Sequence, residues 1–198
     1  MFTSASRDTM LNALVPTHAA LCSAFPGQTF ANELAGGGYA RQAVTFPAAA
    51  GGTGIRTSTN APSFSVPVGD VAWIAFATAA TAGVNVAVSP NGANPKEFFL
   101  STAVANGIYS PAHGLVNNQR ITFYGGTPPT GLTEGTLYYA ITVATDTFQV
   151  SLTSGGSAIA IGPTQAQPGC LLSPIVVENF GAAGTFNLAT GATLNLNY

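Results

Sequence analysis

Residues 31–47 read ANELAGGGYARQAVTFP and contain the most distinctive pattern of the chain. The glycines at residues 36–38 lack a Cβ, so the backbone there can reach positive φ without steric cost. From Tyr39 onward the side chains alternate, which predicts a flexible entry followed by one β-strand. Neither face is uniformly apolar, so we expect this strand at a subunit contact. The predicted faces are Tyr39, Arg41, Ala43 and Thr45 on one side, and Ala40, Gln42, Val44 and Phe46 on the other.

Arg41 is one of only five basic residues in the chain, which favours a specific pairing over a solvated position. We therefore predict a subunit-interface site at Tyr39, Arg41 and Gln42. The sequence offers Arg41 no acidic or histidine partner nearby that would make it catalytic. On this basis, substitution of Arg41 by alanine is expected to weaken assembly more than monomer folding.

The composition excludes several classes of protein. Of the 198 residues, 46% are hydrophobic and only 6% are charged, against about 25% charged in typical soluble domains. High hydrophobicity with a net charge of −2 argues against a disordered chain. The scarcity of Lys and Arg argues against nucleic-acid binding and against a polybasic membrane surface. A surface with so few charges favours self-association, as in a large assembly.

Two further features concern location and redox state. Residues 71–88 carry no charge, but threonines, a glycine and an asparagine interrupt them, so we predict paired buried strands and no membrane span. Residues 1–15 lack the basic start and apolar run of a signal peptide. Cys22 and Cys170 are the only cysteines, and we predict that both are free and buried, with a disulfide as the alternative.

The pattern along the chain predicts one helix followed by many short strands. Residues 6–15 form the helix, with Ser6 as its cap, Asp8 in its first turn and Pro16 after its end. Its apolar face is predicted to hold Met10, Leu11, Leu14 and Val15. Strands are predicted at residues 17–25, 63–68, 71–77, 84–88, 98–104, 175–177, 185–188 and 194–198, and the run 71–77 is apolar on both faces, as in a central strand.

Residues 110–167 hold several tight hairpins of their own and resemble a small module inserted into a larger domain. Residues 120–124 form one predicted strand. In the next hairpin Leu137, Tyr139, Ile141 and Val143 are predicted to face the same way as Phe148, Val150 and Leu152. The sequence thus predicts an all-β fold, a jelly-roll-like or Greek-key β-sandwich with one short N-terminal helix and an inserted β-rich module. The predicted domains are 1–108 plus 172–198 for the body and 109–171 for the insert.

No residue set suggests catalysis, a cofactor or a metal. His18 and His113 have no second ligand at metal-binding spacing, and the seven carboxylates are scattered. No nucleophile elbow or phosphate loop is present. We therefore expect a protein that is not an enzyme and binds no cofactor. Buried packing is favoured for Trp73, Tyr138 and Tyr139, with a sugar platform as the alternative.

Residues 31–47, residues 64–70 (FSVPVGD) and residues 178–188 (ENFGAAGTFNL) resemble a family of small virion proteins of tailed bacteriophages. The insert is similar to a second phage module, on residues 113–123 (HGLVNNQRITF), and on 131–139 (GLTEGTLYY) with 147–150 (TFQV). The resemblance implies a structural role and leaves capsid and tail both open.

The leading hypothesis is a capsid decoration (cement) protein that assembles as a homo-oligomer, a trimer being one option, on the major capsid protein or on neighbouring virion subunits. The alternatives are a tail-tip or tail-fibre component and a carbohydrate-binding module for host attachment. In each case the expected location is the virion, assembled in the cytoplasm of the host bacterium, with no nucleic-acid or membrane partner.

Overall fold

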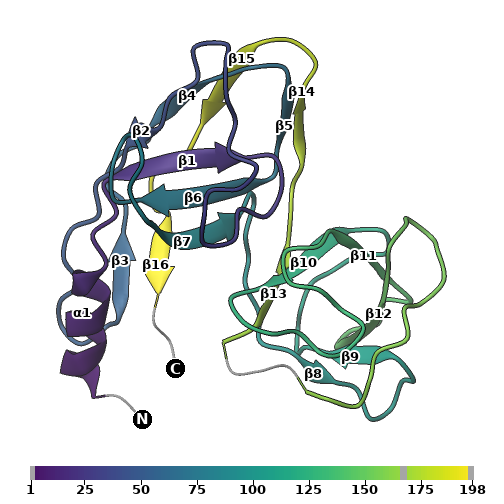
Figure 1. Ribbon diagram of the computed structural model, residues 1–198. Helices are drawn as coiled ribbons and strands as arrows, with labels where there is room; N and C mark the ends of the chain where they lie inside the picture. Colours follow the sequence, from purple (N-terminus) through teal and green to yellow (C-terminus); the bar gives the residue numbers. More distant parts are fainter. Residues whose placement is uncertain (1–2, 166–168, 196–198) are drawn as a thin grey trace. The chain divides into compact units, whose positions relative to one another are not determined.

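The computed structural model describes residues 3–165 and 169–195. Figure 1 shows many short strands joined by irregular segments, with one helix near the N-terminus, which confirms the predicted all-β fold. The chain forms two compact units. We call Met1–Ser89 with Val177–Tyr198 the body, and Pro90–Val176 the insert. Among the described residues, no helix is long and apolar enough to cross a membrane.

The body contains a four-stranded antiparallel sheet. Its central pair runs from His18 opposite Ala77 to Cys22 opposite Trp73. Every residue of the strand that begins at Trp73 is buried, as its continuous apolar run predicts. The strand order is β2 (Gln42–Ala43), β1 (His18–Cys22), β6 (Trp73–Ala77) and β7 (Asn85–Pro90).

The last strands of the chain pair with residues 55–71 of the body, in three consecutive antiparallel pairs. Thr57 lies opposite Thr193, and Ser65 lies opposite Thr185 in the same register. At Gly69, opposite Phe180, the register shifts by one residue. We call this interrupted two-stranded structure the long ribbon. Its pairs are β3 (Ile55–Thr57) with β16 (Thr193–Asn195), β4 (Ser63–Val66) with β15 (Gly184–Asn187), and β5 (Gly69–Val71) with β14 (Glu178–Phe180).

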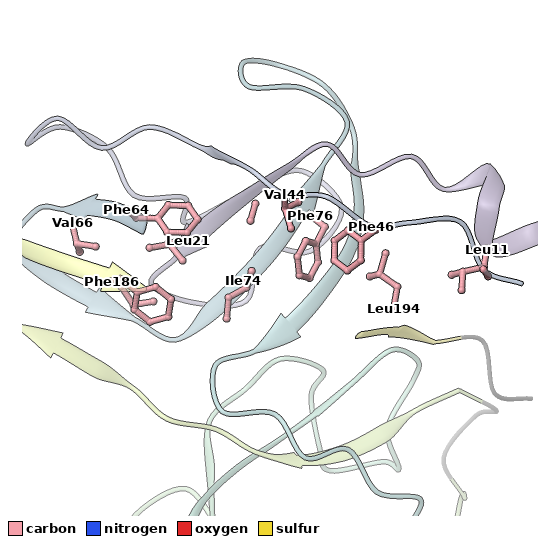
Figure 2. Packing of buried hydrophobic residues seen from close by; sticks show 13 residues of the cluster. Leu11, Leu21, Val44, Phe46, Phe64, Val66, Ile74, Phe76, Phe186 and Leu194 are labelled. Carbon is pink, nitrogen blue, oxygen red and sulfur yellow. The ribbon is translucent and has the colours of Figure 1, made fainter. Parts of the chain in front are cut away.

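Side chains of the sheet and of the long ribbon meet in one hydrophobic core (Figure 2). In the ribbon, alternation places Phe64 and Val66 inside while Ser63 and Ser65 are exposed. Phe64 lies directly opposite Phe186, with ring centroids 6.3 Å apart in an edge-on arrangement. The core residues are Leu11, Ala19, Leu21, Val44, Phe46, Ala49, Phe64, Val66, Val71, Ile74, Phe76, Phe186 and Leu194.

Helix α1 (Ser4–Ala13) is attached to the body through polar groups as well as through Leu11. The carboxylate of Asp8 accepts hydrogen bonds from the backbone N–H groups of Gly52 and Gly54, at 2.7 and 2.8 Å. Asp8 therefore holds a loop. The prediction that it lies in the first turn is wrong, because the helix begins at Ser4 and its first turn contains no acidic residue. The predicted cap at Ser6 and the predicted bounds 6–15 are wrong, because the helix begins two residues earlier and ends at Ala13. Its cap is Thr3, whose hydroxyl accepts from the N–H of Ser6.

The buried side chain of Arg56 joins the end of α1 to the following segment. Its guanidinium donates to the backbone oxygens of Leu11 and Leu14 at the C-terminal end of the helix, and to those of Phe46 and Pro47. Carbonyl groups at a helix C-terminus carry partial negative charge, so they stabilise this cation without a carboxylate partner.

The predicted apolar face of the helix is wrong for two of its four residues. Leu11 is buried and Leu14 is half-buried, whereas Met10 and Val15 are exposed. The chain leaves the helix at Leu14, which has an extended conformation, so helical spacing no longer applies to Val15.

The strand predicted from Tyr39 onward is also largely wrong. Only Gln42–Ala43 forms a strand, and the residues on either side are irregular. Alternation holds for the second half, where Val44 and Phe46 are buried. In the first half Tyr39 and Arg41 turn inward instead, because polar partners for both lie inside the body, as described below. Residues 36–38 adopt positive φ, as their lack of a Cβ permits.

The insert is a six-stranded antiparallel sheet with its own core. The strand predicted at residues 120–124 is confirmed, as is the hairpin that follows it. The order is β13 (Leu171–Pro174), β10 (Arg120–Tyr124), β11 (Tyr138–Ile141), β12 (Thr147–Ser151), β9 (Gly107–Tyr109) and β8 (Phe99–Leu100).

The face assigned to this hairpin is wrong for its first strand. Ala140 lies opposite Val150, so Tyr138 and Ala140 share the core face with Phe148 and Val150, and Leu137 is exposed. The prediction chose Leu137, Tyr139, Ile141 and Val143 because this alternating set is the more hydrophobic of the two. The register with the partner strand determines which set faces the core. Leu152, which was assigned to the same face as Phe148, is exposed.

The two ends of the insert are held side by side. The N–H of Val176 donates to the backbone oxygen of Asn91 at 2.8 Å. The structural boundaries fall at Pro90 and Val176, whereas the sequence analysis placed the insert at residues 109–171. The strand predicted at 98–104 contributes β8 to the insert sheet, and residues 175–177 are not a strand. The predicted strand 194–198 corresponds to β16 up to Asn195, and its last three residues lie outside the described part.

The core of the long ribbon generates a test of the fold. Phe186→Ala should lower the free energy of unfolding of the body by about 3–5 kcal/mol, because it leaves a cavity opposite Phe64. Asn187→Ala is the matched control, since Asn187 is exposed on the same strand and should change stability by no more than about 0.5 kcal/mol. Urea unfolding of both variants provides the measurement, and equal stabilities would contradict the pairing.

Candidate functional site

The predicted interface residues lie beside the edge of the four-stranded sheet. Gln42 belongs to β2, which is an edge strand and pairs with β1 only at His18 and Ala19. Its side-chain amide donates to the backbone oxygen of Ala40, a local contact. Tyr39 and Arg41 precede the strand and are largely enclosed by the body.

Arg41 forms a bidentate ion pair with Glu33. Its Nε and Nη2 atoms lie 2.8 and 2.7 Å from the two carboxylate oxygens. The side chain of Arg41 is 9% exposed and that of Glu33 is 19% exposed, so water screens the pair only weakly. The hydrogen bond that Arg41 donates to Glu33 is the main cause that raises the pKa of Arg41 above its usual value. A planar guanidinium matched to a carboxylate in this way is geometrically specific.

The same guanidinium closes the turn between β6 and β7. Nη1 donates to the backbone oxygens of Ala79 and Ala82, at 3.2 and 2.6 Å. Its central carbon lies 3.8 Å from the centre of the Phe30 ring, a cation–π contact. Arg41 therefore joins the loop before Glu33 to a turn of the sheet.

Backbone strain gathers around this pair. Phe30, Asn32 and Ala82 all have φ in the left-handed region, at 55°, 66° and 53°. A bulky residue such as Phe30 adopts that conformation rarely and at a cost of about 1–3 kcal/mol. Phe30 and Ala82 contact Arg41, and Asn32 lies next to Glu33. The ion pair therefore helps to hold the strained loop, together with the hydrogen bonds of Asn32 to Phe25 and Ser23.

Tyr39 extends the network toward the core. Its hydroxyl accepts the N–H of Leu21 at 2.8 Å and donates to Glu33 at 3.3 Å. Burial is the main cause that raises the pKa of this hydroxyl, so it stays protonated. The pKa of the nearby Cys22 thiol is raised to about 12. Burial is the larger cause, and the negative charge of Glu33 raises this pKa further. A neutral thiol is a poor nucleophile.

The sequence analysis predicted that Arg41 has no acidic partner nearby, and this prediction is wrong. Glu33 precedes Arg41 by eight residues, and the glycines between them turn the chain back so that the two side chains meet. A signal was present, because both charges flank the glycines in a chain with very few charges. The hypothesis of a subunit interface at Tyr39, Arg41 and Gln42 stays a prediction.

The remaining candidate residues have structural surroundings. His113 is buried, its Nδ1 accepts the N–H of Leu115 at 2.9 Å, and its ring lies 5.2 Å from that of Phe148. His18 hydrogen bonds through Nδ1 with the hydroxyl of Thr17. Among the described residues, no group of three or more His, Cys, Asp or Glu side chains could hold a metal ion.

Two further predictions from the sequence can be compared with the structure. Cys22 and Cys170 are both free and buried, as predicted. The prediction of buried packing is confirmed for Tyr138, which lies in the core of the insert and whose hydroxyl accepts the N–H of Thr133, so the alternative of a sugar platform does not hold for this residue. Trp73 is likewise buried, packed edge-on against Phe25. Tyr139, which is half-buried, is not part of that core.

Comparison with models of protein families gives a match. A family model described as Podophage GP4 fiber I protein gp80 matches residues 3–101, which is half of the chain. The matched residues include the Glu33–Arg41 pair and the four-stranded sheet. No curated protein and no solved structure matches the chain.

The ion pair generates a test that separates folding from assembly. Arg41→Ala should lower the free energy of unfolding of the body by about 2–5 kcal/mol, because it leaves a largely buried carboxylate without its partner. The exposed Arg120 serves as the control, and Arg120→Ala should have an effect of no more than about 0.5 kcal/mol.

Chemical unfolding of the monomer gives both values, and a cycle with Glu33→Ala isolates the coupling between the two side chains. A stable Arg41→Ala monomer that fails only in assembly would instead support the original interface hypothesis for this residue.

Proposed function

This chain belongs to the podophage GP4 fiber I protein gp80 family, and from that membership we propose that it is a fibre subunit of a phage tail. The family makes the chain a structural protein of a tailed-phage virion, in agreement with the resemblance found in the sequence. The observation that carries the finer proposal is the family description, which names a fibre. It favours the tail-fibre alternative over the capsid cement hypothesis.

We further propose that the fibre subunit is not an enzyme and that it associates with copies of itself and with neighbouring virion subunits. Two of the seven carboxylates are engaged in holding loops, since Asp8 accepts from two backbone amides and Glu134 accepts the N–H of Gly125. β2 lies at the edge of its sheet, where Gln42 is half-buried and Ala43 is exposed, and the contact between copies would form there. The backbone oxygen of Ala43 accepts from the side chain of Asn60, so this contact would be made through side chains. Assembly would take place in the host cytoplasm.

Copy number separates the two locations. A tail fibre is expected in far fewer copies than the major capsid protein, because the tail occupies one vertex of the particle, whereas cement covers the whole lattice. Quantitative mass spectrometry of purified virions, with the major capsid protein as internal standard, measures this ratio. A ratio close to that of the major capsid protein would reject the fibre proposal in favour of cement.

The edge of β2 provides a second test. Gln42→Lys should weaken self-association at least about tenfold, because two charges would face each other across a contact between copies. Monomer stability should change little, since the only side-chain hydrogen bond of Gln42 among the described residues is the one to Ala40. Thr185→Lys, at an exposed position of β15, is the matched control. Sedimentation analysis gives the dissociation constants, and unchanged association in Gln42→Lys would refute this interface.

A further inference from the structure

An open cavity of about 550 Å³ lies on the insert, outside the site described above. Its walls are residues 100–103, which begin at the last residue of β8, Tyr109 at the end of β9, and residues 144–147 before and at the start of β12. Figure 1 shows β8 and β9 next to each other, as their pairing requires. A volume of this size is in the range of small-molecule sites.

Two exposed aromatic side chains mark this part of the insert. Phe99 lies directly opposite Tyr109, and Tyr109 lies opposite Thr147, so the three share one face of the sheet. That face is the solvent face, because Ile108 and Phe148 point into the core. Phe99 is 52% exposed and Tyr109 is 39% exposed. Aromatic rings on a solvated sheet provide flat apolar area that the insert core does not use.

Hydrogen-bonding groups line the cavity beside these rings. Asp146 is held in place because its Oδ1 accepts the N–H of Ala112 at 2.8 Å and its backbone oxygen accepts the N–H of Ser110. Among the described residues, no hydrogen bond engages its Oδ2 or the hydroxyls of Thr145 and Thr147. A fixed carboxylate oxygen next to free hydroxyls can bind adjacent hydroxyl groups of a ligand.

The charge of the lining narrows the class of ligand. Asp146 is its one charged residue, and no Lys or Arg lines the cavity. A negatively charged ligand such as a phosphate or an acidic sugar would therefore be repelled and would find no cation. A ligand with one apolar face and several neutral hydroxyls fits both features, and a pyranose ring has this character.

We propose that this cavity binds a neutral pyranose unit of a bacterial surface polysaccharide. The apolar C–H face of the sugar would lie on Tyr109, with Phe99 extending the platform, and its hydroxyls would donate to Asp146. The bacterial source of the polysaccharide rests on the proposed function as a phage fibre, whereas the sugar chemistry rests on the cavity alone. The site differs from the sugar platform at Trp73, Tyr138 and Tyr139 that the sequence analysis gave as the alternative to buried packing.

The test uses the purified full-length protein on an array of defined neutral and acidic oligosaccharides and bacterial surface polysaccharides. Saturation-transfer NMR then confirms each interaction in solution. We expect binding to at least one glycan with neutral hexoses, and about tenfold weaker binding by Tyr109→Ala. Asp146→Asn should also weaken binding while keeping the oxygen that accepts from Ala112, so its fold is preserved. Val116→Ala, at an exposed position of the insert outside the lining, should bind as the unchanged protein does.

Three results would overturn the proposal: no binding to any neutral glycan, binding restricted to acidic glycans, or unchanged binding by both Tyr109→Ala and Asp146→Asn. These results are independent of copy number in the virion. A low-copy protein without glycan binding would keep the fibre proposal and reject this site. A high-copy protein with glycan binding would reject the fibre proposal and keep the site.

Discussion

The body depends on the pairing of its last strands with residues 55–71. Phe64 and Phe186 meet across that pairing, and the sheet residues Leu21 and Ile74 pack in the same core. The core is therefore complete only when both ends of the chain are present. Contacts between residues so far apart in sequence are slow to form, because loop closure precedes the gain from packing. Once formed, they make the two segments of the body one unit.

Such an arrangement tolerates a large insertion. The entropy of loop closure grows slowly with length, by about 0.6 kcal/mol for each doubling. The insert also has its own core, and the hydrogen bond between Asn91 and Val176 holds its ends together. For the folding of the body, the insert therefore acts like a short loop between Ser89 and Val177. The family match covers the sheet of the body and ends at residue 101, within the insert, so most of the residues that line the cavity lie beyond the match.

Local patterns predicted the elements whose environment is set by their own sequence. The buried strand Trp73–Ala77 and the alternating strand Ser63–Val66 were both evident, because an apolar run or a period of two suffices to define them. Features that depend on distant partners were not. The inward turn of Arg41 depends on Glu33 and on the carbonyls at Ala79 and Ala82, which no spacing rule connects. The cavity depends on register between β8, β9 and β12, where a shift of one residue would move Tyr109 to the core face.

The few cations of the chain reveal how its surface is adapted. Arg56 and Arg41 are enclosed by carbonyls and by a carboxylate, and Arg7 and Lys96 are half-buried, so only Arg120 among the five is exposed. A buried ion pair gives little net stability compared with apolar packing, but it fixes one geometry because a misplaced charge is costly. The chain thus uses its charges to define loops and leaves a surface with almost no positive charge. Copies with so few surface charges approach each other without strong electrostatic repulsion. A neutral polysaccharide also needs no charged side chains for its binding, so the low surface charge suits both proposed contacts.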